Sequence, residues 1–128
     1  MRTAFLRGRD HQQIGRLELE GIDEAAIALS RGGTRKTYSH TDLNEDCVAF
    51  AVGDGGQVVI AADGHHGELG SEAAVEAILD GFASDWTAAP TPATSEADWR
   101  AIGIEALLAS NRAILEAAGR NQLPPAPT

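Results

Sequence analysis

Two apolar runs separated by a tight turn constrain the fold of this chain more than any other feature of its sequence. The runs are CVAFAV at 47–52 and VVIAA at 58–62, and between them lies Gly53-Asp54-Gly55-Gly56. An Asp-Gly pair between apolar runs is a strong local signal for a β-hairpin, because both residues tolerate the backbone angles of a two-residue turn. We predict a hairpin that turns at Asp54-Gly55. A turn at Gly55-Gly56, which shifts the strand pairing by two residues, stays open as the alternative.

Strand signals also precede the hairpin. Residues 16–20 alternate polar and apolar side chains, as a half-buried strand does. Residues 25–30 contain a short apolar run, which Gly32-Gly33 then interrupts. We therefore predict two strands before the polar stretch 34–44.

A helical pattern follows the hairpin. Ser71 is a suitable N-cap, and apolar residues recur at helical spacing from Val75 to Trp86. The sequence predicts an amphipathic helix from Ser71 to about Trp86, followed by a linker over 87–94 that contains Pro90 and Pro92.

A second helix begins at Ser95, which with Asp98 resembles a capping box, and we predict that it runs to about Ala118 and closes at Gly119. Its apolar residues cover much of the helix circumference, namely Trp99, Ile102, Ile104, Leu107, Leu108, Ile114 and Leu115. This distribution predicts burial on more than one side, with Trp86 and Trp99 as core residues.

Composition narrows the class of partner. Ten Lys and Arg against nineteen Asp and Glu give a net charge of -9, which repels nucleic acid and anionic membrane surfaces and favours a cation. No apolar run approaches the roughly 20 residues that a membrane span needs, and the first residues do not form a signal peptide, so we expect a cytoplasmic protein.

Cys47 is the only cysteine, which excludes an internal disulfide and a cysteine-based metal cluster, and we expect it to be buried. We expect one domain over 1–120 and a Pro-rich disordered tail over 121–128.

Acidic residues flank both ends of the predicted hairpin. Asn44-Glu45-Asp46 comes before its first strand and Asp63-Gly64 after its second. In the preferred register Asp46 and Asp63 lie opposite each other, with Cβ atoms about 5 Å apart. Two carboxylates so close favour a cation between them, and oxygen ligands without cysteine suit magnesium, manganese or calcium. Gly64 allows a sharp bend that turns its carbonyl oxygen toward the same cation. Each motif alone is more often a turn at the end of a strand, because Asn, Asp and Gly favour turns, but the two motifs together favour a metal site.

These residues resemble a known family. Asn44-Glu45-Asp46, a strand-turn-strand and then Asp63-Gly64-His65-His66-Gly67 before a helix look like the opening motifs of the metal-dependent (PPM, type 2C-like) protein phosphatases. The combination is specific, and the resemblance covers about Ile27 to Trp86. It implies an α+β fold, in which this chain is the N-terminal half of a PPM-type β-sandwich flanked by antiparallel helices. It also implies a hydrolase that removes phosphate from phosphoserine and phosphothreonine in a phosphorylated protein substrate.

The resemblance assigns roles by position. Asp63 would bridge two Mn²⁺ or Mg²⁺ ions in a complete domain, and Gly64 would offer its carbonyl oxygen. Glu45 and Asp46 would bind metal or orient metal-bound water. His65 would be the general acid that protonates the departing serine or threonine oxygen. In such a centre the metals lower the pKa of a bridging water and neutralise charge on the phosphoryl oxygens.

The chain departs from the family pattern in two ways. The arginine that usually stands three residues before the asparagine is Thr41 here, and Arg35 or Lys36 is a possible substitute for holding phosphate. The family's later Gly-Asp-Ser strand, Ser-Asp-Gly turn and Asp-Asn ligands have no counterpart before Thr128. We expect a fragment of a longer phosphatase that is inactive alone, with a truncated relative that needs a partner as the alternative.

Two other functions stay open. One is a non-catalytic regulatory or binding module derived from the phosphatase fold, which Thr41 in place of arginine would suit. The other is a small α/β domain in which the acidic turns are purely structural. The sequence leaves the substrate protein, the native metal and the oligomeric state undetermined.

Overall fold

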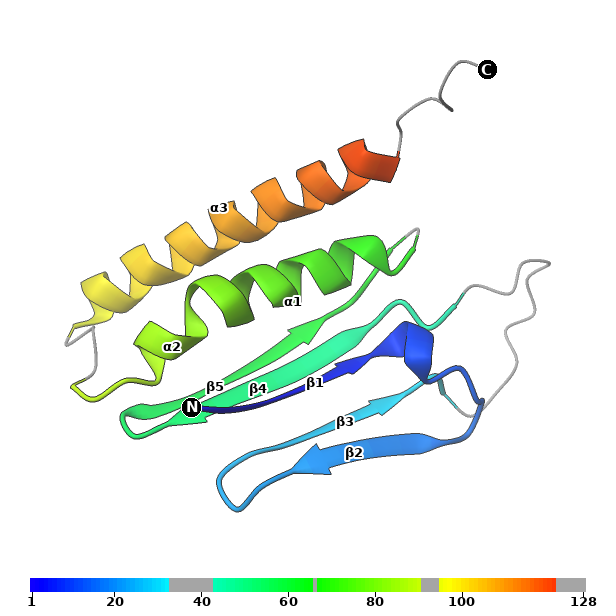
Figure 1. Cartoon of the computed structure of the whole chain (residues 1–128), viewed down its shortest axis with the longest axis horizontal. Coiled ribbons are helices and arrows are strands. Elements are labelled where there is room, and N and C mark those ends of the chain that lie inside the picture. Colours follow the sequence, from blue (N-terminus) through cyan, green and yellow to red (C-terminus); the bar gives the residue numbers. More distant parts are fainter. Residues whose placement is uncertain (33–42, 66, 91–94, 122–128) are drawn as a thin grey trace.

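The computed structural model describes residues 1–32, 43–65, 67–90 and 95–121, and it has a mixed α+β fold arranged in layers (Figure 1). Sheet A has the strand order β1 (Arg2–Arg7), β4 (Cys47–Gly53), β5 (Gly56–Ala62). Sheet B pairs β2 (Leu17–Gly21) with β3 (Ala26–Ser30). The helices are α1 (Leu69–Gly81), α2 (Ala83–Trp86) and α3 (Glu96–Asn121), and a short 3-10 turn, η1, covers Gly8–Asp10. The predicted α+β class is confirmed.

The hairpin has the preferred register. β4 and β5 pair antiparallel from Cys47 opposite Ala62 to Gly53 opposite Gly56, which leaves Asp54-Gly55 as the two-residue turn. The shifted register is therefore wrong, and Asp46 and Asp63 are the residues just beyond the last pair.

The first strand of sheet A was not predicted. β1 pairs antiparallel with β4, with Arg2 opposite Val52 and Arg7 opposite Cys47. Its apolar run, Ala4-Phe5-Leu6, is only three residues long and lies between Arg2 and Arg7, so no strand stands out in the sequence. Pairing with a buried neighbour decides its conformation, because local β-propensity is weak compared with packing.

The central strand β4 contributes to a core on each of its faces. Phe50 and Val52 pack with Leu6, Ile27 and Leu29 between the two sheets. Cys47 and Ala49 pack with Val75 of α1 on the opposite face. A strand covered on both faces reads as a continuous apolar run, which is why CVAFAV shows no alternation. Burial of Phe50, which is 2% exposed, stabilises the fold by roughly 1.5–3 kcal/mol.

The helices form two further layers on sheet A. α1 lies on the face of sheet A opposite sheet B, and α3 runs antiparallel to α1 on its outer side (Figure 1). The first helix begins at Leu69, so the prediction of Ser71 as its N-cap is wrong. The predicted single helix is interrupted at Phe82, which separates α1 from α2. α3 begins with the predicted capping box but continues past Gly119 to Asn121. Residues 122–128 of the predicted tail lie outside the described residues.

The hairpin turn is held by the segment after α2. The amide of Gly55 donates a hydrogen bond to the carbonyl oxygen of Thr87, at 2.9 Å. A Cβ atom on Gly55 would overlap the carbonyl group of Ala88, so only glycine allows this approach. The turn end of the hairpin is therefore fixed against the helical layer, and its other end is free to form the acidic site.

Candidate functional site

Asp46 and Asp63 lie at one end of the β4–β5 hairpin and line the same pocket. The pocket has a volume of about 410 Å³. Besides the two aspartates it is lined by residues of β3, β4 and β5, namely Ala28, Leu29, Ser30, Cys47, Val48, Ala61 and Ala62. Asp46 is half-buried and Asp63 is exposed. Asp46 and Asp63 directly flank adjacent antiparallel strands at one end of the sheet, as predicted. Their reach to a single ion and their roles stay predictions.

Gly64 brings the two acidic motifs close together. Its amide donates a hydrogen bond to Oδ1 of Asp46, at 3.4 Å. A Cβ atom on Gly64 would lie 2.7 Å from Cβ of Glu45, and it would also overlap the Glu45 carbonyl oxygen. The close approach of the two backbones therefore requires glycine at this position.

Glu45 holds the loop that leads to α1. Its Oε1 accepts a hydrogen bond from the amide of Gly67, at 2.8 Å, and its carbonyl oxygen accepts one from the hydroxyl of Ser71. Glu45 does not line the aspartate pocket. The sequence predicted Ser71 as a helix cap, whereas its hydroxyl links α1 to the segment just before β4. The hydroxyl also contacts Sγ of Cys47, at 3.6 Å.

The other predicted site residues are less closely placed. His65 is exposed and does not line the aspartate pocket. His66, Thr41, Arg35 and Lys36 lie outside the described residues. The structure therefore brings together Asp46, Asp63 and Gly64, with Glu45 beside them.

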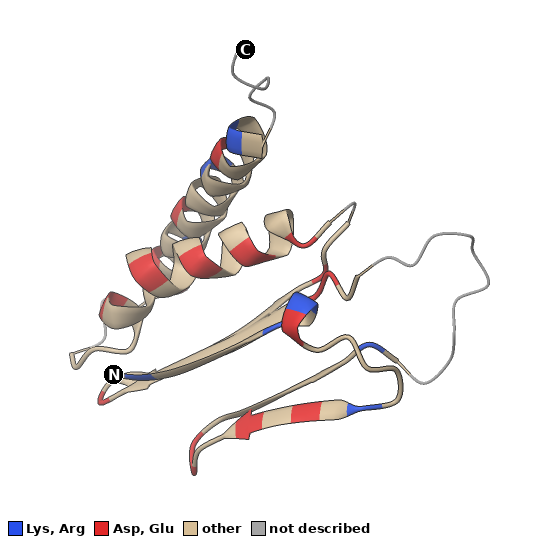
Figure 2. Cartoon of the chain, turned by 45° about the vertical axis from the view of Figure 1, so that its right-hand side comes forward, with Lys and Arg blue, Asp and Glu red and all other residues tan. Residues whose placement is uncertain are grey.

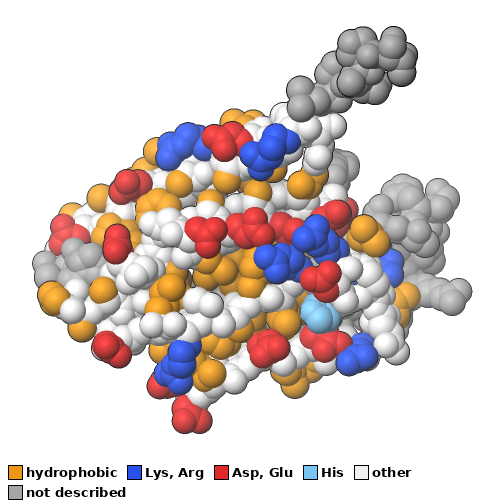
Figure 3. Space-filling view, in the orientation of Figure 1, with side chains coloured by type: hydrophobic (Ala, Val, Ile, Leu, Met, Phe, Trp, Pro, Cys, Tyr) orange, Lys and Arg blue, Asp and Glu red, His pale blue; other side chains and the backbone are white. Residues whose placement is uncertain are grey.

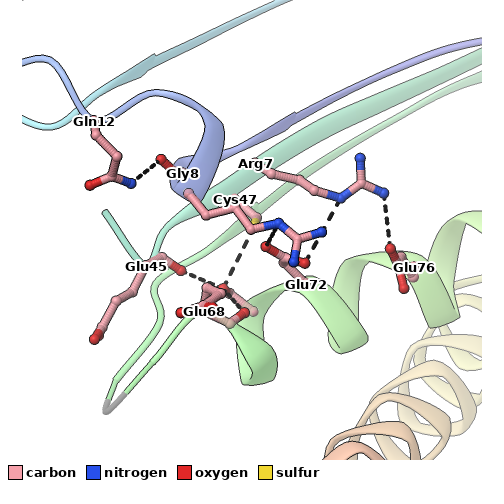
Figure 4. Close-up of polar contacts among 10 residues, drawn as sticks. Arg7, Gly8, Gln12, Glu45, Cys47, Glu68, Glu72 and Glu76 are labelled. Atoms are coloured by element: carbon pink, nitrogen blue, oxygen red, sulfur yellow. Dashed lines mark hydrogen bonds and ion pairs between the residues drawn. The ribbon is translucent and has the colours of Figure 1, made fainter. Parts of the chain in front are cut away.

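A second group of contacts, which the sequence did not predict, joins Asn44 and Asp46 to Gly8 and Gln12. The amide of Gly8 donates to the carbonyl oxygen of Asp46, at 2.8 Å. Gln12 donates from Nε2 to the carbonyl oxygen of Gly8, at 2.6 Å (Figure 4). Its side-chain oxygen accepts from the amide of Asn44, at 2.9 Å. A single glutamine thus joins η1 to the segment that carries the acidic residues. Because the interaction spans 32 positions, no local pattern could reveal it.

Arg7 at the end of β1 and Arg9 in η1 meet acidic residues of α1 beside this site. Nε of Arg9 lies 3.0 Å from Oε1 of Glu72, and Nη2 of Arg7 lies 2.9 Å from Oε1 of Glu76 (Figure 4). The Glu72 side chain is only 9% exposed. Burial raises the pKa of the Glu72 carboxyl; Arg9 and Arg7 lower it, and Glu68 and Glu76 raise it further. This cluster ties sheet A to α1 through a partly desolvated ion pair.

A smaller polar pocket of about 210 Å³ lies at the other side of η1 and includes Asp10, His11 and Glu18. Nδ1 of His11 is 3.8 Å from Oε1 of Glu18, and the same oxygen pairs with Nε of Arg16. Arg16 thus pairs with the carboxylate of Glu18 within this pocket.

The donors in the aspartate pocket suit a hard divalent cation. Asp46 and Asp63 are carboxylates, the ligands that Mg²⁺ and Mn²⁺ prefer. Among the described residues no group of three His, Cys, Asp or Glu side chains is placed to hold a metal ion. The two aspartates would therefore supply only part of a coordination sphere, and the carbonyl oxygen of Gly64 stays a predicted additional donor.

Comparisons with known proteins leave the family open. No protein-family model, curated protein or solved structure matches this chain. Within the part of the chain that the structure describes, no helix combines the length and apolar character of a membrane span.

Proposed function

We propose that this chain carries part of the metal centre of a cytoplasmic protein serine/threonine phosphatase of the PPM type. The observation that supports the proposal best is the position of Asp46 and Asp63 at one end of the hairpin, on one pocket. The same two motifs carry the resemblance to the family, so sequence pattern and spatial arrangement point to the same residues.

In this proposal Asp63 and Asp46 hold Mn²⁺ or Mg²⁺, and Gly64 keeps the two strands close enough to share the ion. When bound, the metal supplies Lewis acidity for hydrolysis of a phosphate monoester. Glu45 positions the 64–67 loop through its bond to the Gly67 amide, which is 2.8 Å long. His65, exposed on this loop, protonates the departing serine or threonine oxygen.

Calorimetric Mn²⁺ titration of the chain tests the metal site directly. Asp63→Asn should weaken binding by about tenfold or more, since even indirect partners of a metal ligand typically contribute 10–100-fold to affinity. Asp54→Asn is the matched control, because Asp54 is an exposed aspartate at the opposite end of the same hairpin. If both variants bind Mn²⁺ as the unmodified chain does, the metal site is wrong.

Turnover tests the reaction. The 128-residue chain should hydrolyse an aryl phosphate at background rate with Mn²⁺ present, because two carboxylates do not complete a dinuclear centre. In a longer protein that contains the remaining ligands, Asp63→Asn should abolish turnover. His65→Gln should leave Mn²⁺ affinity unchanged and slow a phosphopeptide about 10²–10⁴-fold, more than an aryl ester whose departing oxygen needs no proton. Equal slowing of both esters would rule out the general-acid role.

A non-catalytic metal-binding module is the second candidate. It predicts Mn²⁺ binding that depends on Asp63, but no turnover even when the longer protein is complete.

A further inference from the structure

The outer face of α3 is apolar although nothing among the described residues covers it. The inner face packs on α1 through Ala106, Ser110 and Ala117, and the Ser110 hydroxyl lies 3.4 Å from the carbonyl oxygen of Ala74. On the opposite face large apolar side chains reach solvent: Ile104 is 50% exposed, Leu107 69%, Leu108 55% and Leu115 63%. Figure 3 shows hydrophobic side chains between charged ones along this helix. Exposed apolar patches of this kind mark interaction surfaces.

The exposed residues follow a heptad seam. Alternating steps of four and three residues along the exposed face of α3 pick out Ala97, Ala101, Ile104, Leu108, Asn111, Leu115 and Ala118. All of them are exposed, and all but Asn111 are apolar. A strip with this spacing faces a second helix in a coiled coil, and a single polar residue within such a seam selects register and orientation. Packing on α1 does not require this pattern, because that contact uses the other face.

Charge distinguishes α3 from the rest of the molecule. α3 carries four acidic and three basic residues, a net charge of -1, whereas the whole chain carries -9. Figure 2 shows basic residues on α3, whereas the charged residues along α1 are all acidic. Two copies of this acidic chain therefore repel each other only weakly where α3 meets α3.

The charges beside the seam are self-complementary. Glu105 and Arg112 each follow a seam residue, Ile104 and Asn111, and so flank the same side of the strip. In an antiparallel pair whose two-fold axis passes between Leu108 and Asn111, each Glu105 faces Arg112 of the other copy. A parallel pair would instead set Glu105 against Arg100 and Arg112 against the exposed Leu107, which leaves Arg112 without an acidic partner across the seam. We propose that α3 docks antiparallel on α3 of a second copy of this chain, through the seam from Ala97 to Ala118.

Sedimentation velocity of the chain over a range of concentrations tests the proposal. The unmodified chain should form a reversible dimer. Leu108→Glu should weaken dimerisation by about tenfold or more, a change of roughly 1.4 kcal/mol, because it places a charge in the apolar seam. Val59→Glu is the matched control, since Val59 is 58% exposed on β5, away from α3, and should leave the dimer unchanged. Far-UV circular dichroism melts of both variants check that each still folds.

A charge swap tests the orientation. Glu105→Arg alone and Arg112→Glu alone should each weaken the dimer, because each places like charges in contact, and the double variant should restore it. A monomer at every concentration overturns the proposal, and so does a dimer disrupted by Val59→Glu but not by Leu108→Glu. A dimer weakened by the seam variant but unaffected by the charge swap overturns the antiparallel pairing.

Discussion

Gly64 shows how one missing side chain sets the spacing of the candidate site. A Cβ atom there would lie 2.7 Å from Cβ of Glu45 and would force the two acidic motifs apart. Asp46 accepts a hydrogen bond from the Gly64 amide, so a shift of the loop would also move that carboxylate. The glycine is thus required by packing, whatever the site binds.

We predict that Gly64→Ala destabilises the chain by about 1–3 kcal/mol, the usual cost of overpacking. Gly103→Ala is the control, because nothing lies within 4 Å of the Cβ position outside the helix backbone, and alanine in mid-helix should stabilise by up to about 1 kcal/mol. Urea unfolding of both variants measures the difference. A Gly64 variant as stable as the unmodified chain would show that the loop relaxes freely.

Glu72 predicts a pH dependence of stability. Its pKa is raised above the ordinary value of 4.5, chiefly by burial, so the folded chain binds this proton more tightly than the unfolded chain does. The stability that protonation contributes is fully present below pH 4.5 and is lost as the pH rises through the folded pKa. The unfolding free energy of the unmodified chain minus that of Glu72→Gln should therefore be larger near pH 4.5 than at pH 7.

Chemical denaturation at both pH values measures this difference. The contributions of the other carboxyl groups to stability cancel, because both proteins carry them. The same comparison with Glu116→Gln, an exposed carboxylate on α3, provides the control. A difference that falls toward acid pH would mean that the arginine pairs outweigh burial.

At the scale of single elements, the sequence of α3 predicted that a helix forms but did not predict which of its sides are buried. The capping box at its start formed as predicted: the Asp98 amide donates to Oγ of Ser95 and the Ser95 amide to Oδ2 of Asp98, both at 3.1 Å. Its predicted burial on more than one side did not, since the outer apolar residues are exposed and Trp99, expected in the core, is 46% exposed. Helix formation depends on residues three or four apart, whereas burial depends on what lies opposite.

Ser95→Ala should cost about 1 kcal/mol, the typical effect of losing an N-cap. Ser84→Ala, at an exposed serine of α2, should change stability by less than about 0.5 kcal/mol. Thermal unfolding of both variants makes the comparison. Equal effects would show that the cap bonds contribute nothing beyond the serine itself.

At the scale of the whole molecule, β4 is the central strand and is covered on both of its faces. Sheet B lies on one of its faces and α1 on the other, and Cys47 is 0% exposed. Burial raises the pKa of the Cys47 thiol, which further lowers the population of the reactive thiolate. A thiol reagent can therefore reach Cys47 only when the layers separate.

Cys47 should react with a thiol reagent about a hundredfold or more slower in the folded chain than in denaturant, and its rate should rise with urea in step with global unfolding. A chain with Ser84→Cys and Cys47→Ala carries an exposed thiol instead and should react quickly in both conditions. Rapid labelling of Cys47 without denaturant would show that α1 leaves sheet A in a local opening.

The sequence by itself determined the local elements and the pairing of the two acidic motifs. The Asp54-Gly55 turn sets the register of β4 and β5, whose last pair is Cys47 with Ala62, so Asp46 and Asp63 come directly after the same pair. The strands 17–21 and 26–30 and the capping box of α3 likewise follow from patterns within a few residues.

Only the tertiary structure decided which of these residues meet partners far along the chain. β1 became a strand through β4, Ser71 became a link to Glu45 instead of a helix cap, and Gln12 joined η1 to Asn44. Glu45 and Asp46 are neighbours in sequence, yet only Asp46 lines the pocket with Asp63. Local patterns depend on backbone geometry that repeats every two or 3.6 residues, but contacts over tens of residues depend on how whole layers stack.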